Sequence, residues 1–293
     1  MKKVKKSVII KEQFLTEFIK GENIMRNFKP EIIFHFDPTL SRNEIENSFE
    51  KGLAITAKVV TNDLNTQKLC LKLGHNLFGT MDWEESSIYS LTNKYSGMTT
   101  VPDQVSAIMD RTVRVMVTAI DADGHITLSR KANQCKAWEE LKNTYQSIFE
   151  ASVVGVHKEG TGVFLDVGEG LISFCHLHQF TSTRVNLRDW VKYGDIYRVA
   201  IHDIDVQNKR ISCSRKLSCT KDYDDYKKYD IVDVKIAMPI ECDGKITGYN
   251  VEVAPNVRGI ADVPYIPRKF EQGESVQACI KKIWDRKMKL AIL

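Results

Sequence analysis

The chain has 293 residues, of which 43% are hydrophobic and 27% are charged, and its formal net charge is +4. This composition is typical of a soluble globular protein with two or three domains, and it excludes a disordered or fibrous chain. The charge is only mildly basic, so by itself it assigns no class of partner. No apolar run approaches the roughly 20 residues that cross a bilayer, so we expect no membrane contact.

The amino-terminal residues and the cysteines indicate the compartment. The stretch MKKVKKSVII follows its lysines with too few apolar residues for a secretory signal. The seven cysteines are odd in number and scattered, and none forms a C-x-x-C pair, which favours reduced thiols over a disulfide framework. We therefore expect a cytoplasmic protein.

Residues 1–50 are predicted to form an amino-terminal extension with a short amphipathic helix. Its apolar stripe, at helical spacing, consists of Phe14, Leu15, Phe18 and Ile19. Such a helix either packs on the domain that follows or docks on a partner protein. The sequence leaves both interpretations open.

Three segments share a middle and an ending, which indicates one structural unit repeated three times. The middles are LFGTMDWEE, GEGLISFCH and VRGIADVPY, whose glycines Gly79, Gly170 and Gly259 lie about 90 residues apart. The endings are GHITLSRKA, KRISCSRKL and RKMKLAIL. A period of this length predicts tandem domains rather than a solenoid. The predicted domains are residues 51–132, 149–217 and 230–293, joined by linkers at residues 133–148 and 218–229.

Within a unit the pattern is one of strands. The second unit contains five short alternating or β-branched runs, EASVVGVH, GVFLDV, GLISFC, IYRVAIHDID and KRISCSRK, separated by turn residues. Five such strands suit a small closed OB-fold barrel. The predicted fold class is therefore all-β, with three tandem five-stranded barrels, an amino-terminal extension and a short helical linker. The linker helix is predicted from the helical spacing of Trp138, Leu141, Tyr145 and Ile148.

An aromatic side chain on the outer face of a strand is the first functional signal. In GTGVFLDVGEG, Val163, Leu165 and Val167 alternate and share the buried face, so Phe164 and Asp166 are expected to face water. Barrels of this kind hold oligonucleotides on the face formed largely by their second and third strands. We expect a nucleobase to stack on Phe164, unless a loop or a neighbouring barrel covers this ring.

The second unit and the linker carry a family resemblance. The run GTGVFLDVGEGLISF, the D-x-x-x-x-R-I-S-x-S ending that begins at Asp205, and the linker SRKANQCKAWEELKNTYQ resemble the tandem RNA-binding domains of bacterial ribosomal protein S1. The likeness covers roughly residues 51–293. It implies that Phe164, Asp205 and Arg210 contact RNA.

Two residues of the second unit depart from that family. Thr161 stands where the family has a first aromatic residue, and Ser173 where it has a histidine. The resemblance therefore implies one stacking platform in this unit rather than two.

Further residues of the second unit complete its predicted RNA-binding set. Gly162 keeps the surface beside the aromatic ring low enough for a sugar-phosphate chain to approach. His176 and His178, after the third strand, are expected to stack on bases or hydrogen-bond to them. Arg215 and Lys216 belong to the basic run that follows the last strand.

The third and first units differ in what they offer. The third is predicted to present Tyr249 in GYNVEV, at the place that matches Phe164, with Tyr265 after its third strand and Lys287 on its last strand. The alternative is that both tyrosines pack at barrel rims. The first unit has no aromatic residue on its second strand, KLCLKLG, and is expected to be an anchor or spacer.

Metal and catalytic chemistry are less well supported. Cys175, His176 and His178 carry groups that zinc prefers, but no second pair completes a tetrahedral site. The sequence contains no phosphate-binding loop motif, nucleophile-elbow motif or H-E-x-x-H motif. We therefore expect a protein that is not an enzyme and needs no cofactor.

The sequence thus predicts a protein that binds single-stranded RNA and brings messenger RNA to the small ribosomal subunit. The predicted contact with the subunit is the helix that carries Phe14, Leu15, Phe18 and Ile19, together with the first barrel. Two alternatives stay open: an accessory RNA-binding protein of RNA decay or transcription, and a scaffold whose barrels mainly bind proteins.

Overall fold

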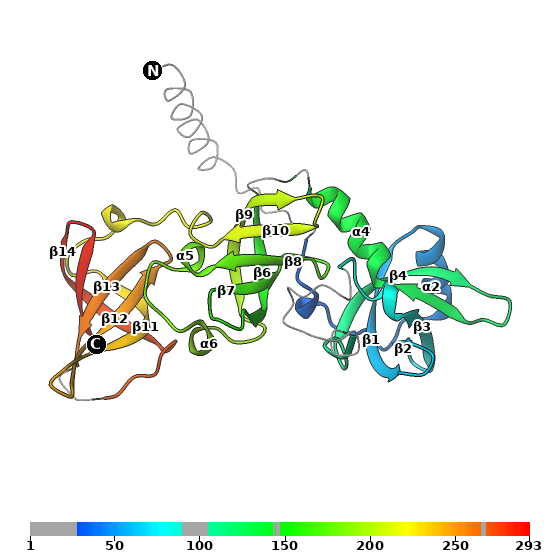
Figure 1. The fold of residues 1–293 in the computed structure, drawn as a ribbon, viewed down its shortest axis with the longest axis horizontal. Coiled ribbons are helices and arrows are strands. Elements are labelled where there is room, and N and C mark those ends of the chain that lie inside the picture. The colour runs from blue at the N-terminus through cyan, green and yellow to red at the C-terminus, as the bar shows by residue number, and fades with distance from the viewer. Residues whose placement is uncertain (1–27, 90–104, 143, 145–146, 265–267) are drawn as a thin grey trace, which may run out of the picture.

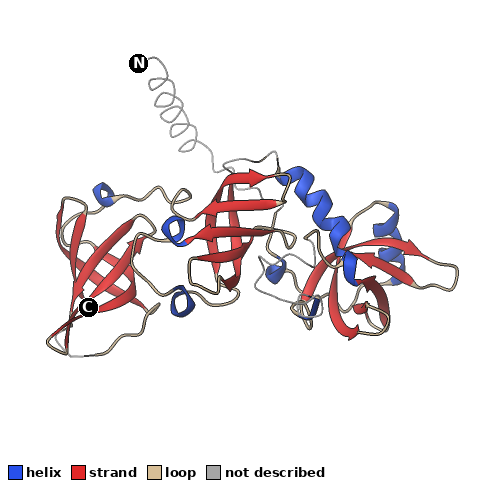
Figure 2. Ribbon diagram, viewed as in Figure 1, coloured by secondary structure: helices blue, strands red, loops and turns tan. Residues whose placement is uncertain are grey.

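The computed structural model describes residues 28–89, 105–142, 144, 147–264 and 268–293. Three barrels follow one another along the long axis of the molecule, in the order of the sequence (Figure 1). Strands dominate each barrel, and short helices lie between and beside the barrels (Figure 2). The helix predicted around Phe14 lies outside the described residues.

The first barrel packs around leucine and valine side chains. Its strands are β1 (Ala54–Asp63), β2 (Lys68–Gly74), β3 (Leu77–Asp82), β4 (Thr112–Ile120) and β5 (Ile126–Ser129), and the 3-10 helix η2 (Trp83–Glu85) follows β3. On β2, Leu69, Leu71 and Leu73 point inward and are fully buried, as the alternation in KLCLKLG predicted.

The second barrel is central in the chain and in space (Figure 1). Its strands are β6 (Ile148–Val156), β7 (Gly162–Asp166), β8 (Ile172–His176), β9 (Ile196–Asp205) and β10 (Arg210–Ser214), and the one-turn helices α5 (Leu177–Phe180) and α6 (Leu187–Trp190) lie between β8 and β9. Val163, Leu165 and Val167 are fully buried, so the predicted inner face of β7 is confirmed.

The third barrel begins after a linker that contains the 3-10 helix η4 (Tyr223–Asp225). Its strands are β11 (Ile231–Cys242), β12 (Lys245–Ala254), β13 (Val257–Asp262), β14 (Ser275–Trp284) and β15 (Lys287–Ile292). Val251, Ile280 and Leu290 are fully buried in its core.

The three barrels share one topology. In each, the first three strands form an antiparallel meander, the last strand pairs in parallel with the third, and the fourth strand closes the barrel against the first. Closure leaves no open sheet edge, which is how a five-stranded OB-fold stabilises so small a sheet. The predicted all-β class with three tandem five-stranded barrels is confirmed.

The linker helix differs from its predicted extent. Helix α4 (Arg130–Leu141) starts directly after β5, because the hydroxyl of Ser129 caps its first turn by accepting from the Ala132 N–H at 2.8 Å. Ile148, predicted to be helical, is the first residue of β6, and Tyr145 lies outside the described residues. Trp138 and Leu141 belong to the buried core cluster of the second barrel, and α4 also lies against β4 and η2 of the first barrel, so the helix packs between the two barrels.

The segment before the first barrel connects it to the second. It contains the 3-10 helix η1 (Glu31–Ile33) and helix α2 (Arg42–Glu50), whose Ser41 and Glu44 form a capping box. The Glu31 carboxylate accepts from Arg130 Nε at 2.8 Å and Nη2 at 2.6 Å, and its backbone N–H donates to Asp166 Oδ2 at 2.7 Å. Residues of the extension, α4 and β7 are thus held in one buried network.

The second and third barrels meet through another buried ion pair. Arg215 Nη1 lies 2.7 Å from Glu252 Oε1, and the Glu252 side chain is 3% exposed. The hydroxyl of Thr181 also donates to Glu252. Near this pair, Lys235 Nζ donates to the Trp190 carbonyl at 2.8 Å, and both Lys235 and Arg215 lie over the Tyr197 ring. A buried ion pair of this kind fixes the second and third barrels relative to each other, because separating them would leave both charges without partners.

Candidate nucleic-acid interface

Two phenylalanines stand side by side on the outer face of the second barrel. Phe164 on β7 and Phe174 on β8 occupy paired positions of adjacent strands, and their ring centroids lie 5.2 Å apart. Both side chains are half-buried, with buried neighbours before and after them along their strands. They therefore form one aromatic surface on the strands that hold oligonucleotides in OB-folds.

Histidine rings extend this surface at both ends. His157, before β7, lies 6.2 Å from Phe164 and 6.1 Å from Phe174, centroid to centroid. At the other end, His176 lies 6.3 Å from Phe174, and His178 lies 5.0 Å from His176. We call these five rings the aromatic strip. His176 and His178 are exposed, which leaves them accessible as the sequence analysis requires.

Gly162 has a different role from the predicted one. A Cβ at this position would lie 2.3 Å from Cζ of Phe174, so the Phe174 ring already fills the space above the glycine. The absent side chain therefore serves to seat an aromatic ring rather than to leave room for a sugar-phosphate chain.

Two expectations about the outward face are wrong. Ser173 points into the barrel, is fully buried and donates to Sγ of Cys213 at 2.7 Å, so it is not a surface position. Its neighbour Phe174 is the outward residue, so these strands carry two outward aromatic rings where one was predicted. Asp166 is also buried, because the backbone of Glu31 covers it.

Asp205 and Arg210 begin and end the turn between β9 and β10, where they form a strand pair. Both carboxylate oxygens of Asp205 accept from Asn208, at 3.0 Å from its backbone N–H and 2.7 Å from its side chain. These bonds hold the pKa of Asp205 below its usual range. The aspartate thus fixes the shape of the loop that carries Lys209 and Arg210.

Arg215 and Lys216 are placed at the joint between barrels rather than at the aromatic strip. The Arg215 guanidinium pairs with Glu252 and stacks over Phe180 and Tyr197, 5.1 and 5.0 Å from the ring centroids. Burial and the nearby Arg258 lower the pKa of Lys216. The Arg215 guanidinium is thus engaged within the protein by Glu252 and two aromatic rings, which favours a structural role over the predicted contact with RNA.

The predicted residues of the third barrel have mixed outcomes. Tyr249 is 1% exposed and packs edge-on against Phe270, so it belongs to the core and is not a surface platform. Tyr265 lies outside the described residues. Lys287 is exposed at the start of β15 and pairs with Trp284 of β14. Trp284 was not predicted from the sequence, and its ring lies under Lys282 Nζ at 5.2 Å.

The first barrel has no aromatic residue on β2, as expected, but β3 presents one. Phe78 is exposed and pairs with Lys72 of β2.

The run Cys175-His176-Leu177-His178 raised the alternative of a zinc site. In the structure Cys175 is buried inside the barrel, whereas both histidines are exposed. Among the described residues, no group of three or more His, Cys, Asp or Glu side chains is placed to hold a metal ion.

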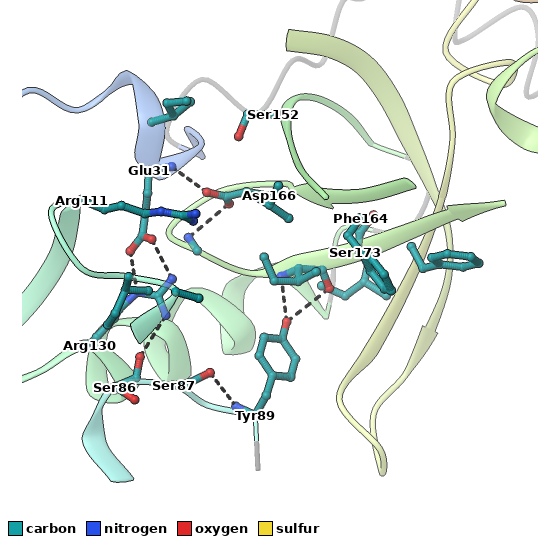
Figure 3. Close-up of a pocket in the computed structure, with 18 of the residues that line it drawn as sticks. Glu31, Ser86, Ser87, Tyr89, Arg111, Arg130, Ser152, Phe164, Asp166 and Ser173 are labelled. Carbon is teal, nitrogen blue, oxygen red and sulfur yellow. Dashed lines mark hydrogen bonds and ion pairs between the residues drawn. The ribbon is translucent and has the colours of Figure 1, made fainter. Parts of the chain in front are cut away.

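The aromatic strip opens into a cavity between the first and second barrels. The cavity has a volume of about 880 Å³ and is lined by both barrels and by the segment around Glu31. Figure 3 shows Phe164 at one side of the cavity and the paired Glu31 and Arg130 at the other. The hydroxyl of Tyr89 lies between them and accepts from the Ile172 N–H at 2.9 Å.

Comparisons with known proteins identify the second barrel. Residues 145–216 match the family model of the S1 RNA binding domain. Small ribosomal subunit protein bS1 of Helicobacter pylori (strain ATCC 700392 / 26695) is 29% identical over 126 residues, which cover 42% of this chain and 23% of that protein. The same-named protein of Mycolicibacterium smegmatis is 31% identical over 139 residues, covering 45% of this chain and 28% of that protein.

Among solved structures, a multidomain protein with nucleic acid binding domains from Streptococcus pneumoniae TIGR4 aligns over 83% of this chain and 73% of its own. Its sequence identity is 16% and its TM-score 0.29. The chain spans less than a third of the length of either bS1 relative. The match to the S1 RNA binding domain covers the second barrel, and the similarity to the bS1 relatives covers less than half of this chain. In the part of the chain that the structure describes, no helix is both long enough and apolar enough to span a membrane.

Proposed function

We propose that the chain binds single-stranded RNA, without catalysis, along the aromatic strip of its second barrel. The observation that carries this proposal is the adjacent pair Phe164 and Phe174 on an S1 RNA binding domain. An unpaired base stacks on such a ring with about 1 to 3 kcal/mol of stabilisation, whatever its identity. Two rings offer two successive bases a platform, which a duplex, whose bases are stacked on each other, cannot use.

Polar and charged groups around the two phenylalanine rings can contact the other bases and the phosphates of the bound RNA. His157, His176 and His178 offer ring faces and ring nitrogens to further bases. The β9–β10 loop, held in shape by Asp205, brings Lys209 and Arg210 to the cavity beside Phe164, where a phosphate would lie. In the third barrel, Lys287 with Trp284 is proposed as a further contact for a longer strand.

Within this function we propose that the bound RNA is messenger RNA brought to the small ribosomal subunit. The support is that the bS1 relatives are proteins of the small ribosomal subunit. The first barrel and the amino-terminal extension are the proposed contact with the subunit. Cosedimentation of the protein with small subunits tests this step. Its absence, with RNA binding intact, would favour an accessory RNA-binding protein of decay or transcription.

Fluorescence anisotropy tests the binding itself. The full chain is titrated into a labelled U-rich single strand and into a duplex of equal length, each at 50 and 200 mM salt. The proposal expects tighter binding of the single strand, with an affinity that falls as salt rises because phosphate contacts release counterions. Equal affinity for the two RNAs, or binding to neither, would contradict it and direct attention to a protein partner.

A further inference from the structure

Residues of both the first and the second barrel line the cavity between them. Tyr193, from the loop between α6 and β9 of the second barrel, lies under the guanidinium of Arg111, which precedes β4 of the first barrel. The guanidinium carbon is 4.6 Å from the ring centroid. Ile32 of the extension and Ile108 of the first barrel add apolar surface. The site is complete only when both barrels are in place.

Tyr193 is an aromatic ring available to a ligand. It is 53% exposed, although it lies at a joint between two domains. An arginine over a tyrosine ring holds that ring in place through a cation–π contact. Tyr193 lines the same cavity as Phe164 and Phe174.

The charges around the cavity favour an anionic ligand with an apolar part. Its two acidic side chains are satisfied within the protein: Glu31 by Arg130, and Asp166 by the backbone N–H groups of Glu31 and Gly168. The cationic side chains that line it include Arg111, Lys209 and Arg210. A volume of about 880 Å³ lies in the range of about 300 to 1,000 Å³ typical of small-molecule sites.

We propose that this cavity receives a nucleobase of the bound RNA, stacked on Tyr193, so that one strand bridges the first and second barrels. The inference rests on the proposed function and extends it, because the strand continues from Phe164 into the cavity. It gives the first barrel a part in RNA binding that its own strands do not predict. The cationic side chains would meet the phosphates that flank the inserted base.

The experiment compares Tyr193→Ala with Tyr229→Ala in the full chain. Tyr229 is a matched control, since it is 66% exposed and lies under Lys228 Nζ at 4.6 Å, but directly before the third barrel. Both variants remove an exposed ring and are expected to fold. Affinity is measured for U-rich single strands of about 4, 8 and 12 nucleotides. We expect Tyr193→Ala to bind the longest strand ~5-fold or more weakly than the unaltered chain, and Tyr229→Ala to match the unaltered chain.

A crosslink adds a readout of location. RNA that carries 4-thiouridine is irradiated on the full chain, and the adducts are located by peptide mass spectrometry. The proposal expects adducts on the segment that contains Ile108 and Arg111 as well as on β7 and β8. Wild-type affinity in Tyr193→Ala without an adduct on the first barrel would overturn it. If Phe164→Ala still weakens binding in that case, the proposed function stands and only the bridging site fails. Absence of single-strand binding in the unaltered chain would overturn both.

Discussion

The Phe174 ring lies directly over the backbone of Gly162, where a Cβ would come within 2.3 Å of its Cζ atom. Phe174 pairs with Phe164 across β7 and β8, and its ring leans over Gly162, two residues before Phe164 on β7. The missing side chain at Gly162 therefore leaves the space that the Phe174 ring occupies beside Phe164.

Replacing Gly162 with alanine tests this seat. The added methyl forces the Phe174 ring aside, and it would also lie 2.7 Å from the Cys175 carbonyl, so we expect weaker single-strand binding and a loss of about 1 to 3 kcal/mol in stability. Anisotropy and urea unfolding measure the two effects. Gly155→Ala is the control, because a Cβ there would meet nothing within 4 Å. Unchanged affinity in Gly162→Ala would mean that the ring position is unimportant.

Arg215 is predicted to support the joint rather than to bind RNA. Arg215→Ala leaves the buried Glu252 carboxylate without its cation, and breaking such a pair costs about 3 to 5 kcal/mol. The salt dependence of RNA binding should keep its slope. Urea unfolding and a salt titration check both statements. Arg286→Ala is the control, since its pair with Asp222 is exposed and worth at most about 1 kcal/mol. A shallower salt slope in Arg215→Ala would restore it as a phosphate contact.

Tyr249 is predicted to matter for stability alone. Tyr249→Leu removes the edge-on contact with Phe270 and the hydroxyl that accepts from the Phe270 N–H at 3.3 Å, so the melting temperature should fall. RNA affinity should stay within about twofold, because a ring inside the barrel has no face for a base. Trp284→Leu offers the comparison of an exposed ring on the same barrel. A large loss of affinity in Tyr249→Leu, with the fold intact, would contradict this assignment.

Asp166 makes the first joint sensitive to pH. Burial, followed by the Glu31 carboxylate, raises the pKa of Asp166 to about 7. The folded state therefore holds a proton that the unfolded chain releases near pH 4, so stability should fall as pH rises from about 4 to about 7 and level off above. Unfolding free energies across this range measure the slope. In Asp166→Asn the slope should be shallower, although the protein is less stable because an amide N–H would face a backbone N–H. An unchanged slope would assign the effect to other groups.

Alternation along the strands predicted the barrels well, because inward residues must be apolar wherever one face is buried. Val163 and Leu165 on β7 show this, as does Val167 directly after β7, and the leucines of β2 show it in the first barrel. The same alternation predicts that Tyr249 is buried, because it lies two residues before the buried Val251 on β12. Its alignment with Phe164 led instead to the prediction of an exposed ring. Phe174 was missed because Ser173, the inward residue beside it, is polar.

The joints between barrels had no such signal in the sequence. Nothing near Arg215 indicates that Glu252 will lie against it, since that contact depends on how two separate barrels dock. In the same way, the alternation that set Asp166 outward was correct for an isolated strand, and the extension around Glu31 then covered it. Contacts of this kind follow from tertiary packing, and they decide which basic residues remain available to RNA.

The most direct test of the account is a double-mutant cycle on the two platforms. Affinity for a U-rich single strand is measured for the unaltered chain, Phe164→Ala, Phe174→Ala and the double variant, with Phe49→Ala, an exposed phenylalanine on α2, as control. Each platform variant should lose about 1 to 3 kcal/mol of binding free energy, and the two losses should not add fully because the rings touch. Wild-type affinity in the double variant, with its fold intact, would contradict the assignment of this face to RNA.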